Sequence, residues 1–111
     1  MSREYPKSVA LDERKFLEWL NTKPRDEEYR FRANKTCAVA QYLKFRHPGE
    51  GVSANVEYAS VWDWEGRFTH RYDIPPVVQR AFGKITGAKR GRPITFGETA
   101  DSLSELLMAD A

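Results

Sequence analysis

The chain has few of the residues that build disulfides, metal centres and membrane spans. Its 111 residues include one cysteine and two histidines, so an internal disulfide cannot form and the dispersed side chains lack the spacing of a metal site. No apolar run approaches the ~20 residues of a transmembrane helix, and residues 1–10 have no apolar core of a signal peptide. We therefore expect a cytoplasmic protein with no membrane anchor, metal or cofactor.

Motifs for nucleotide chemistry and covalent catalysis are also missing. No Gly-x-Gly-x-x-Gly follows an apolar strand pattern, and there is no phosphate-binding loop with its lysine. Cys37 could act as a nucleophile only with His47 or His70. It is followed by Ala38-Val39-Ala40, a context typical of a small buried side chain. We therefore predict a protein that is not an enzyme.

The residues that are present are typical of one packed domain. Hydrophobic residues make up 41% of the chain and aromatic residues 13%, which is enough to bury a core without crosslinks. Residues 1–10 are predicted to be a flexible lead-in, and residues 11–111 a single domain.

Charge is unevenly distributed, although the net charge is only +2. Residues 93–111 contain four acidic residues and no basic residue. Residues 67–92 contain one acid, Asp73, and seven basic residues, which are Arg67, Arg71, Arg80, Lys84, Lys89, Arg90 and Arg92. Such a basic stretch can form a surface that steers a charged partner. The alternative is ordinary solvation of outward faces, and the sequence leaves both open.

Four segments have the apolar spacing and the end signals of helices. The second is apolar on every side, which predicts a central helix buried by several neighbours. The fourth begins with the capping-box pair Thr95 and Glu98. The four run from Asp12 to about Lys23, from Asn34 or Thr36 to about Phe45, from Pro75 to Gly83 or Gly87, and from Thr95 to about Met108.

Residues 52–72 form the predicted β region. Residues 52–64 alternate with period two, but thirteen residues exceed a typical strand, so we expect a bulge or break. Val56, Tyr58 and Trp62 fall on the predicted core face, which helices would cover. Residues 63–66 are a predicted hairpin turn, with a loop of two or four residues. Residues 29–32 alternate as a short further strand would.

These elements predict an α+β fold. Strand and helix patterns do not alternate regularly, and too few strands are visible for a parallel doubly wound sheet. We expect a small antiparallel sheet, a β-hairpin plus a candidate third strand, packed against about four helices.

Several short motifs share a pattern with a known group. They are Glu18-Trp19-Leu20, Thr22-Lys23-Pro24, Asp26-Glu27, Tyr29, Cys37-Ala38, Ala40-Gln41-Tyr42-Leu43 and Thr95-Phe96-Gly97. This series resembles a group of small uncharacterised phage and prophage proteins of proteobacteria. The resemblance implies a mobile-element origin, action inside a bacterial host cell, and function by binding, for example as an inhibitor of host defence of the anti-CRISPR kind. It implies no catalytic motif.

The basic turn Lys89-Arg90-Gly91-Arg92-Pro93 resembles the core of an AT-hook. In such an arm Arg90 and Arg92 would extend along a narrow A·T minor groove, and Gly91 would let the backbone approach its floor. A helix start follows at Thr95, whereas a free arm would continue with basic residues. The alternative is therefore a solvated loop between two helices.

The predicted hairpin supplies a second candidate surface. Trp64 at the turn has few neighbours to bury it, and with Arg67 it is the predicted interface anchor, because aromatic and arginine side chains are typical of binding hot spots. Arg71, Arg80 and Lys84 extend the predicted contact surface. We expect a host protein or nucleoprotein complex as the partner. The alternative is DNA, bound through Lys89, Arg90, Gly91 and Arg92.

Overall fold

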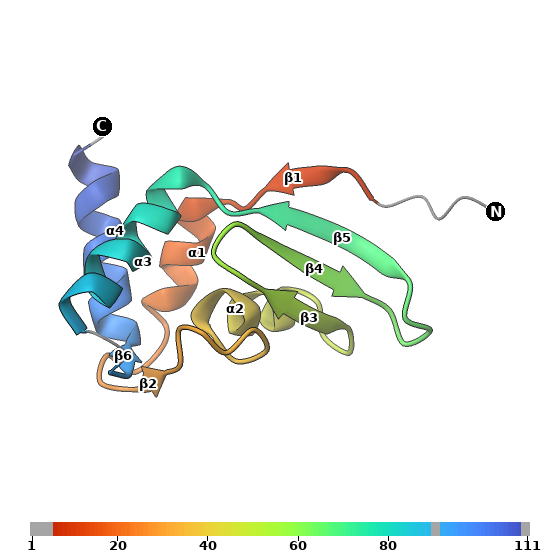
Figure 1. Cartoon of the computed structure of the whole chain (residues 1–111), viewed down its shortest axis with the longest axis horizontal. Helices are drawn as coiled ribbons and strands as arrows, with labels where there is room; N and C mark the ends of the chain where they lie inside the picture. The colour runs from red at the N-terminus through yellow and green to blue at the C-terminus, as the bar shows by residue number, and fades with distance from the viewer. Residues whose placement is uncertain (1–5, 90–91, 110–111) are drawn as a thin grey trace.

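The structure, a computed structural model, describes residues 6–89 and 92–109 (Figure 1). The described residues form an α+β fold with four helices, as predicted. The helices are α1 (Glu13–Leu20), α2 (Ala38–Arg46), α3 (Pro76–Lys89) and α4 (Phe96–Ala109). The strands are β1 (Ser8–Ala10), β2 (Glu28–Tyr29), β3 (Gly51–Ala54), β4 (Tyr58–Trp62), β5 (Phe68–Asp73) and β6 (Ile94–Thr95). In this part of the chain no helix is long and apolar enough to cross a membrane.

The main sheet is mixed, whereas the sequence predicted an antiparallel one. Its order is β1-β5-β4-β3, with antiparallel pairing except between β1 and β5. Ser8 pairs in parallel with Arg71, and Ala10 with Asp73. Residues 8–10, predicted as part of a flexible lead-in, therefore form an edge strand. Three residues are too few for a period-two signal, and only the neighbouring strand makes them a strand.

The long predicted strand breaks at a turn between β3 and β4, in line with the expected break. The Asn55 Oδ1 atom accepts hydrogen bonds from the backbone N–H groups of Glu57, at 2.8 Å, and Tyr58, at 2.9 Å. After this turn the buried positions change parity. They are Val52, Ala54, Ala59 and Val61.

This change of parity overturns part of the predicted core. Val56 and Tyr58 are 48% and 38% exposed. The prediction that they belong to the core face is therefore wrong. Trp62 is half-buried, on the same side of β4 as Tyr58. A period-two pattern continued through a turn assigns every later residue to the wrong face.

Two predicted helix starts are confirmed by their caps. At the start of α1, the Asp12 Oδ1 atom accepts from the N–H groups of Arg14 and Lys15 at 3.1 and 3.0 Å. At the start of α4, the Thr95 Oγ1 atom accepts from the Glu98 N–H at 3.1 Å, and Glu98 Oε1 accepts from the Thr95 N–H at 3.2 Å. This reciprocal pair is the predicted capping box.

The predicted C-terminal end of α3 and the predicted start of α2 differ from the structure. Helix α3 continues through Gly83 and Gly87 to Lys89, because packing against α4 outweighs the weak helix preference of glycine. One link between these helices is the Ser102 hydroxyl, which donates to the Ala81 carbonyl at 3.0 Å. Helix α2 begins later than expected, with Cys37 as its N-cap residue.

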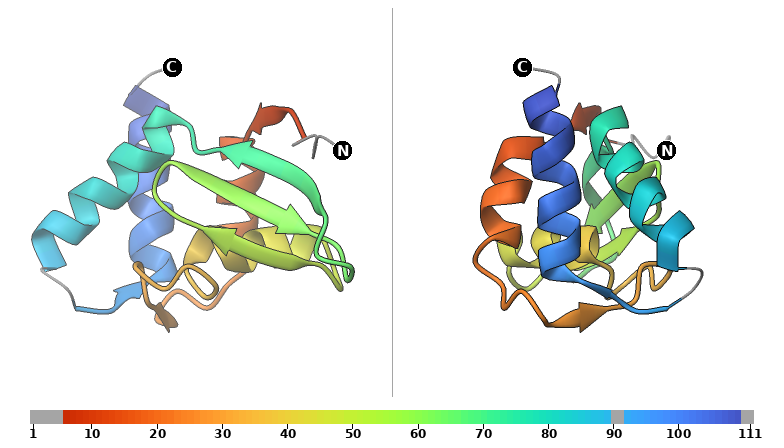
Figure 2. Two further views of the ribbon diagram at one scale, coloured as in Figure 1. Left: turned by 45° about the vertical axis from the view of Figure 1, so that its right-hand side comes forward. Right: turned by 90° about the vertical axis from the view of Figure 1, so that its left-hand side faces the viewer.

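The helices leave one face of the sheet open. Helix α2 lies against one face, and α1, α3 and α4 form a bundle beyond one end of the sheet (Figures 1 and 2). Phe16 is fully buried where these parts meet, with ring centroids 5.3 Å from Tyr42 and 6.3 Å from Phe82. The opposite face of β3, β4 and β5 has no described helix over it (Figure 2).

Gly97 provides a stability test of the α4 start. Its N–H donates to the Arg25 carbonyl at 3.0 Å, and an added Cβ would lie 2.7 Å from that oxygen. Overpacking of about 1–3 kcal/mol should exceed the gain of about 1 kcal/mol that alanine brings to a helix. We predict that Gly97→Ala lowers the free energy of unfolding by about 1 kcal/mol in urea denaturation.

Gly83→Ala is the matched control within α3. Outside the backbone of its own helix and its chain neighbours, no described atom lies within 4 Å of its added Cβ, so this variant should raise stability by about 0.5–1 kcal/mol. A Gly97→Ala protein as stable as Gly83→Ala would contradict the close approach.

Candidate functional site

The uncovered side of the sheet carries a group of aromatic side chains outside the core. We define the open face as the outward positions of β3, β4 and β5, which are Gly51, Ser53, Tyr58, Ser60, Trp62, Phe68, Arg71 and Asp73. The rings of Tyr58, Trp62 and Phe68, with Ser53 and Ser60, line a shallow groove on this face. Phe68 is 46% exposed, so an apolar surface is available to a partner.

Trp62 is held flat on the open face by its neighbours. Its cross-strand partner is Gly51, and a Cβ at Gly51 would lie 2.2 Å from the indole ring. The glycine therefore provides the space in which the ring lies. On the other side Phe68 meets Trp62 edge to face, at 6.2 Å between centroids. The indole therefore packs between Gly51 and Phe68.

A β-bulge brings Phe68 to this face. Val61 pairs with His70 and Trp62 with Phe68, so Thr69 is the extra residue on β5. A bulge of one residue shifts the alternation of side chains. Phe68 therefore shares a face with Trp62, while His70 lies opposite Val61 on the other side.

Arg71 is the basic group of the open face. Its guanidinium lies over the Tyr58 ring, at 4.5 Å from the centroid, a geometry of cation–π attraction. Both side chains are exposed. The sequence predicted Arg71 for the contact surface but placed Tyr58 in the core, so it missed this pair.

The hairpin tip presents Trp64, as predicted, with 88% of its surface exposed. Asp63 shapes the turn, because its Oδ1 atom accepts from the N–H groups of Glu65 and Arg67, both at 3.0 Å. Arg67 pairs with Asp63 at 3.6 Å and with Glu65 at 2.5 Å. Its charge is therefore balanced within the turn, and the tip is aromatic rather than basic.

The five residues predicted for protein contact do not form one surface. Trp64, Arg67 and Arg71 lie on the β4–β5 hairpin, while Arg80 and Lys84 lie on α3 in the helix bundle (Figure 1). Lys84 also pairs with Glu105 of α4 at 3.1 Å. A run of basic residues in sequence is thus divided between two ends of the molecule.

Three arginines line a second groove, here called the basic groove. Arg30, Arg32 and Arg92 meet there, beside a stretch of α3 where Gly83 and Gly87 present no side chain. All three arginines are exposed, and they form no ion pair with another described residue. Arg90, Gly91 and the side chain of Lys89 lie outside the described part of the chain.

Arg30 and Arg32 were missed because their link to Arg92 is long-range. Tyr29 of β2 pairs with Ile94 of β6 in a two-stranded antiparallel sheet. The residues that follow β2 therefore meet those that precede β6, although about sixty positions separate them. The spacing along the chain gives no signal of this meeting.

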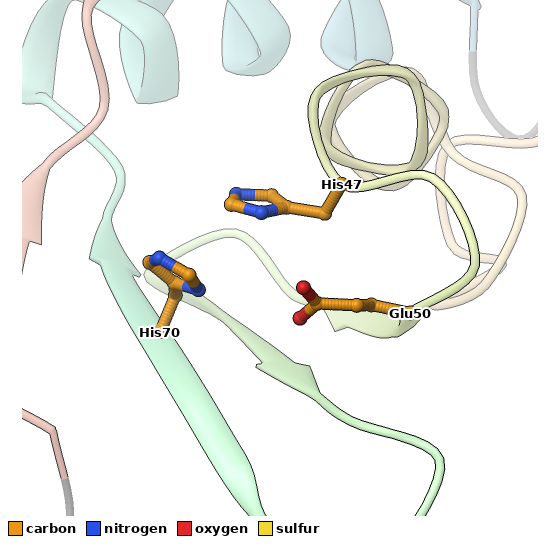
Figure 3. A group of neighbouring side chains, drawn as sticks. All are labelled: His47, Glu50 and His70. Atoms are coloured by element: carbon orange, nitrogen blue, oxygen red, sulfur yellow. The ribbon is translucent and has the colours of Figure 1, made fainter.

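The fold also brings together a cluster of side chains that was not predicted from the sequence. His47, Glu50 and His70 each offer a ligand atom within 4.8 Å of the other two (Figure 3). The sequence predicted no metal site because the two histidines are dispersed. The turn after α2 and the bulge in β5 bring them together.

Cys37 is buried, with 7% of its surface exposed. Burial raises the pKa of its thiol, which opposes the thiolate needed for catalysis. This confirms the interpretation of Cys37 as a core side chain.

The burial of Cys37 can be checked by alkylation. Because it is the single cysteine, mass spectrometry of iodoacetamide-treated protein reports on this thiol alone. We predict much slower labelling of the native chain than of the chain in urea. Equal rates in the two conditions would contradict the buried position.

No family model, no curated protein and no solved structure matches this chain.

Proposed function

We propose that the chain is a non-enzymatic binding protein that contacts a host protein or nucleoprotein complex through the open face and the hairpin tip. The observation that carries this proposal is the uncovered sheet face on which Tyr58, Trp62 and Phe68 lie beside Arg71. Exposed aromatic and arginine side chains are enriched at protein interfaces.

The rigidity of this face supports binding. Trp62 is held between Gly51 and Phe68, and Tyr58 is held under Arg71. A side chain that is already ordered loses little conformational entropy when a partner docks. The face therefore resembles a preorganised contact surface.

The charge of this face favours a protein as the partner. Arg67 is paired with two carboxylates, which leaves Arg71 as the basic group beside the aromatic rings. Affinity for nucleic acid depends on several basic groups that contact phosphates. Arg71 and the exposed Asp73 give the open face both signs of charge, which fits a mixed protein surface better than a polyanion.

Inhibition of host defence is the activity proposed for this contact. Its support is the resemblance of the chain to small phage and prophage proteins, whose action would depend on a host partner. Obstruction of a host complex needs a surface and no catalytic group.

The proposal is tested by removing exposed rings. We predict that Tyr58→Ala and Trp64→Ala each weaken partner binding by about 2 kcal/mol, as loss of a hot-spot side chain does, which is roughly 30-fold in affinity. The partner is first captured from nuclease-treated host lysate, and the affinity is then measured by interferometry with purified components.

Met108→Ala is the matched control, because Met108 is 75% exposed on α4, outside the open face. It should leave binding unchanged. If Tyr58→Ala and Trp64→Ala bind the partner as tightly as Met108→Ala does, the open face and the hairpin tip are not the contact surface. Loss of the partner on nuclease treatment would favour nucleic acid instead.

The second candidate function is DNA binding through the basic groove. The observation that favours it is the meeting of Arg30 and Arg32 with Arg92, the last arginine of the AT-hook-like turn. Three unpaired guanidinium groups in one groove can contact successive phosphates. Arg92 would then act with two arginines that lie outside the turn.

This second function has its own test. We predict that Arg92→Ala weakens binding to A·T-rich duplex and reduces the slope of log affinity against log salt by about 1. Fluorescence anisotropy with A·T-rich and G·C-rich probes measures both effects. Lys15→Ala, which removes an exposed charge on α1, is the control. Equal binding by both variants and the unaltered chain would exclude the basic groove.

A further inference from the structure

A cluster of two imidazoles and a carboxylate lies on the helix-covered side of the sheet, away from the open face. His47 follows the end of α2, Glu50 lies in the next turn, and His70 belongs to β5. Their ligand atoms lie within 4.8 Å of one another, and all three residues are half-buried. Figure 3 shows both rings and the carboxylate turned toward one shared space.

Neighbouring hydroxyl groups orient the cluster. Nε2 of His47 is 2.8 Å from the Tyr72 hydroxyl, and Nδ1 of His70 is 3.0 Å from the Thr69 hydroxyl. The Thr69 hydroxyl donates to Glu50 Oε2 at 2.7 Å. Each ring thus uses one nitrogen in these contacts and keeps the other for a ligand. Second partners of this kind orient histidines in metal sites.

The two imidazole rings lie close together. The His47 and His70 centroids are 4.3 Å apart, so both rings are near enough to bind one ion between them.

We propose that His47, Glu50 and His70 form a binding site for a zinc-type divalent metal ion. Imidazole and carboxylate donors suit Zn²⁺, and two histidines with one carboxylate leave a fourth position for water. The Glu50 carboxylate supplies negative charge. Because the three residues are only half-buried, an ion can reach them from solvent. No part of this proposal depends on the open face or the basic groove.

The geometry needs a small closure. Zinc bonds of about 2.0–2.1 Å in a tetrahedral site place ligand atoms roughly 3.3 Å apart. The separations of up to 4.8 Å must therefore shrink by about 1.5 Å. Rotation of half-buried side chains at a turn and at a bulge can provide this. The ion would join the turn after α2 to strand β5.

The test is titration of the untagged full-length chain, stripped with a chelator, with Zn²⁺ and with Co²⁺. We expect calorimetry to give one Zn²⁺ per chain. The Co²⁺ complex should show the visible bands of a four- or five-coordinate site without a thiolate charge-transfer band, since Cys37 is not a ligand. Binding of Zn²⁺ should also raise the melting temperature.

Variants assign the ligands. Glu50→Gln and His70→Gln should each weaken Zn²⁺ binding by more than tenfold, and Tyr72→Phe by about tenfold, as loss of an orienting partner does. Glu57→Gln is the matched control, because Glu57 is an exposed glutamate in the β3–β4 turn. It should bind as the unaltered chain does. Circular dichroism without metal verifies that each variant folds.

Three outcomes would overturn the proposal. They are no Zn²⁺ binding at millimolar concentration, equal affinity of Glu50→Gln and Glu57→Gln, or a thiolate band in the Co²⁺ spectrum. If one ligand variant fails to fold, the other variant and the Co²⁺ spectrum of the unaltered chain still test whether the cluster binds the metal ion.

Discussion

The turn that Asn55 closes between β3 and β4 accompanies the register on which the open face and the cluster of His47, Glu50 and His70 depend. This side chain closes the turn between β3 and β4, and the turn changes which side chains of β4 face the helices. Ala59 and Val61 become core, while Tyr58 and Trp62 face outward. Because β5 pairs with β4, the same register carries Arg71 to the open face and His70 to the covered one.

The bulge at Thr69 adds a second constraint to the same hairpin. It lets Phe68 join Trp62 on the open face while His70 remains opposite Val61. The Thr69 hydroxyl lies between His70 and Glu50. One extra residue therefore contributes to the aromatic open face on one side of the sheet and to the cluster of His47, Glu50 and His70 on the other.

The pairing of β2 with β6 organises the remaining surface. It brings the arginines after Tyr29 to the groove that Arg92 also lines. The same region anchors α4, since the Phe96 N–H donates to the Glu27 carbonyl at 3.0 Å and Gly97 contacts Arg25. Arg92 is thus part of a groove built on a strand pair.

Features that depend on near neighbours could be predicted from the amino-acid sequence. The caps at Asp12 and Thr95, the exposed Trp64 and the buried Cys37 follow from local hydrogen bonding, turn position and side-chain character. Three features could not be predicted in this way and are visible only in the fold: the outward side of β4, the three-arginine groove and the cluster of His47 with His70. Each of these depends on strand register or long-range pairing, in which one inserted residue reverses every later side chain.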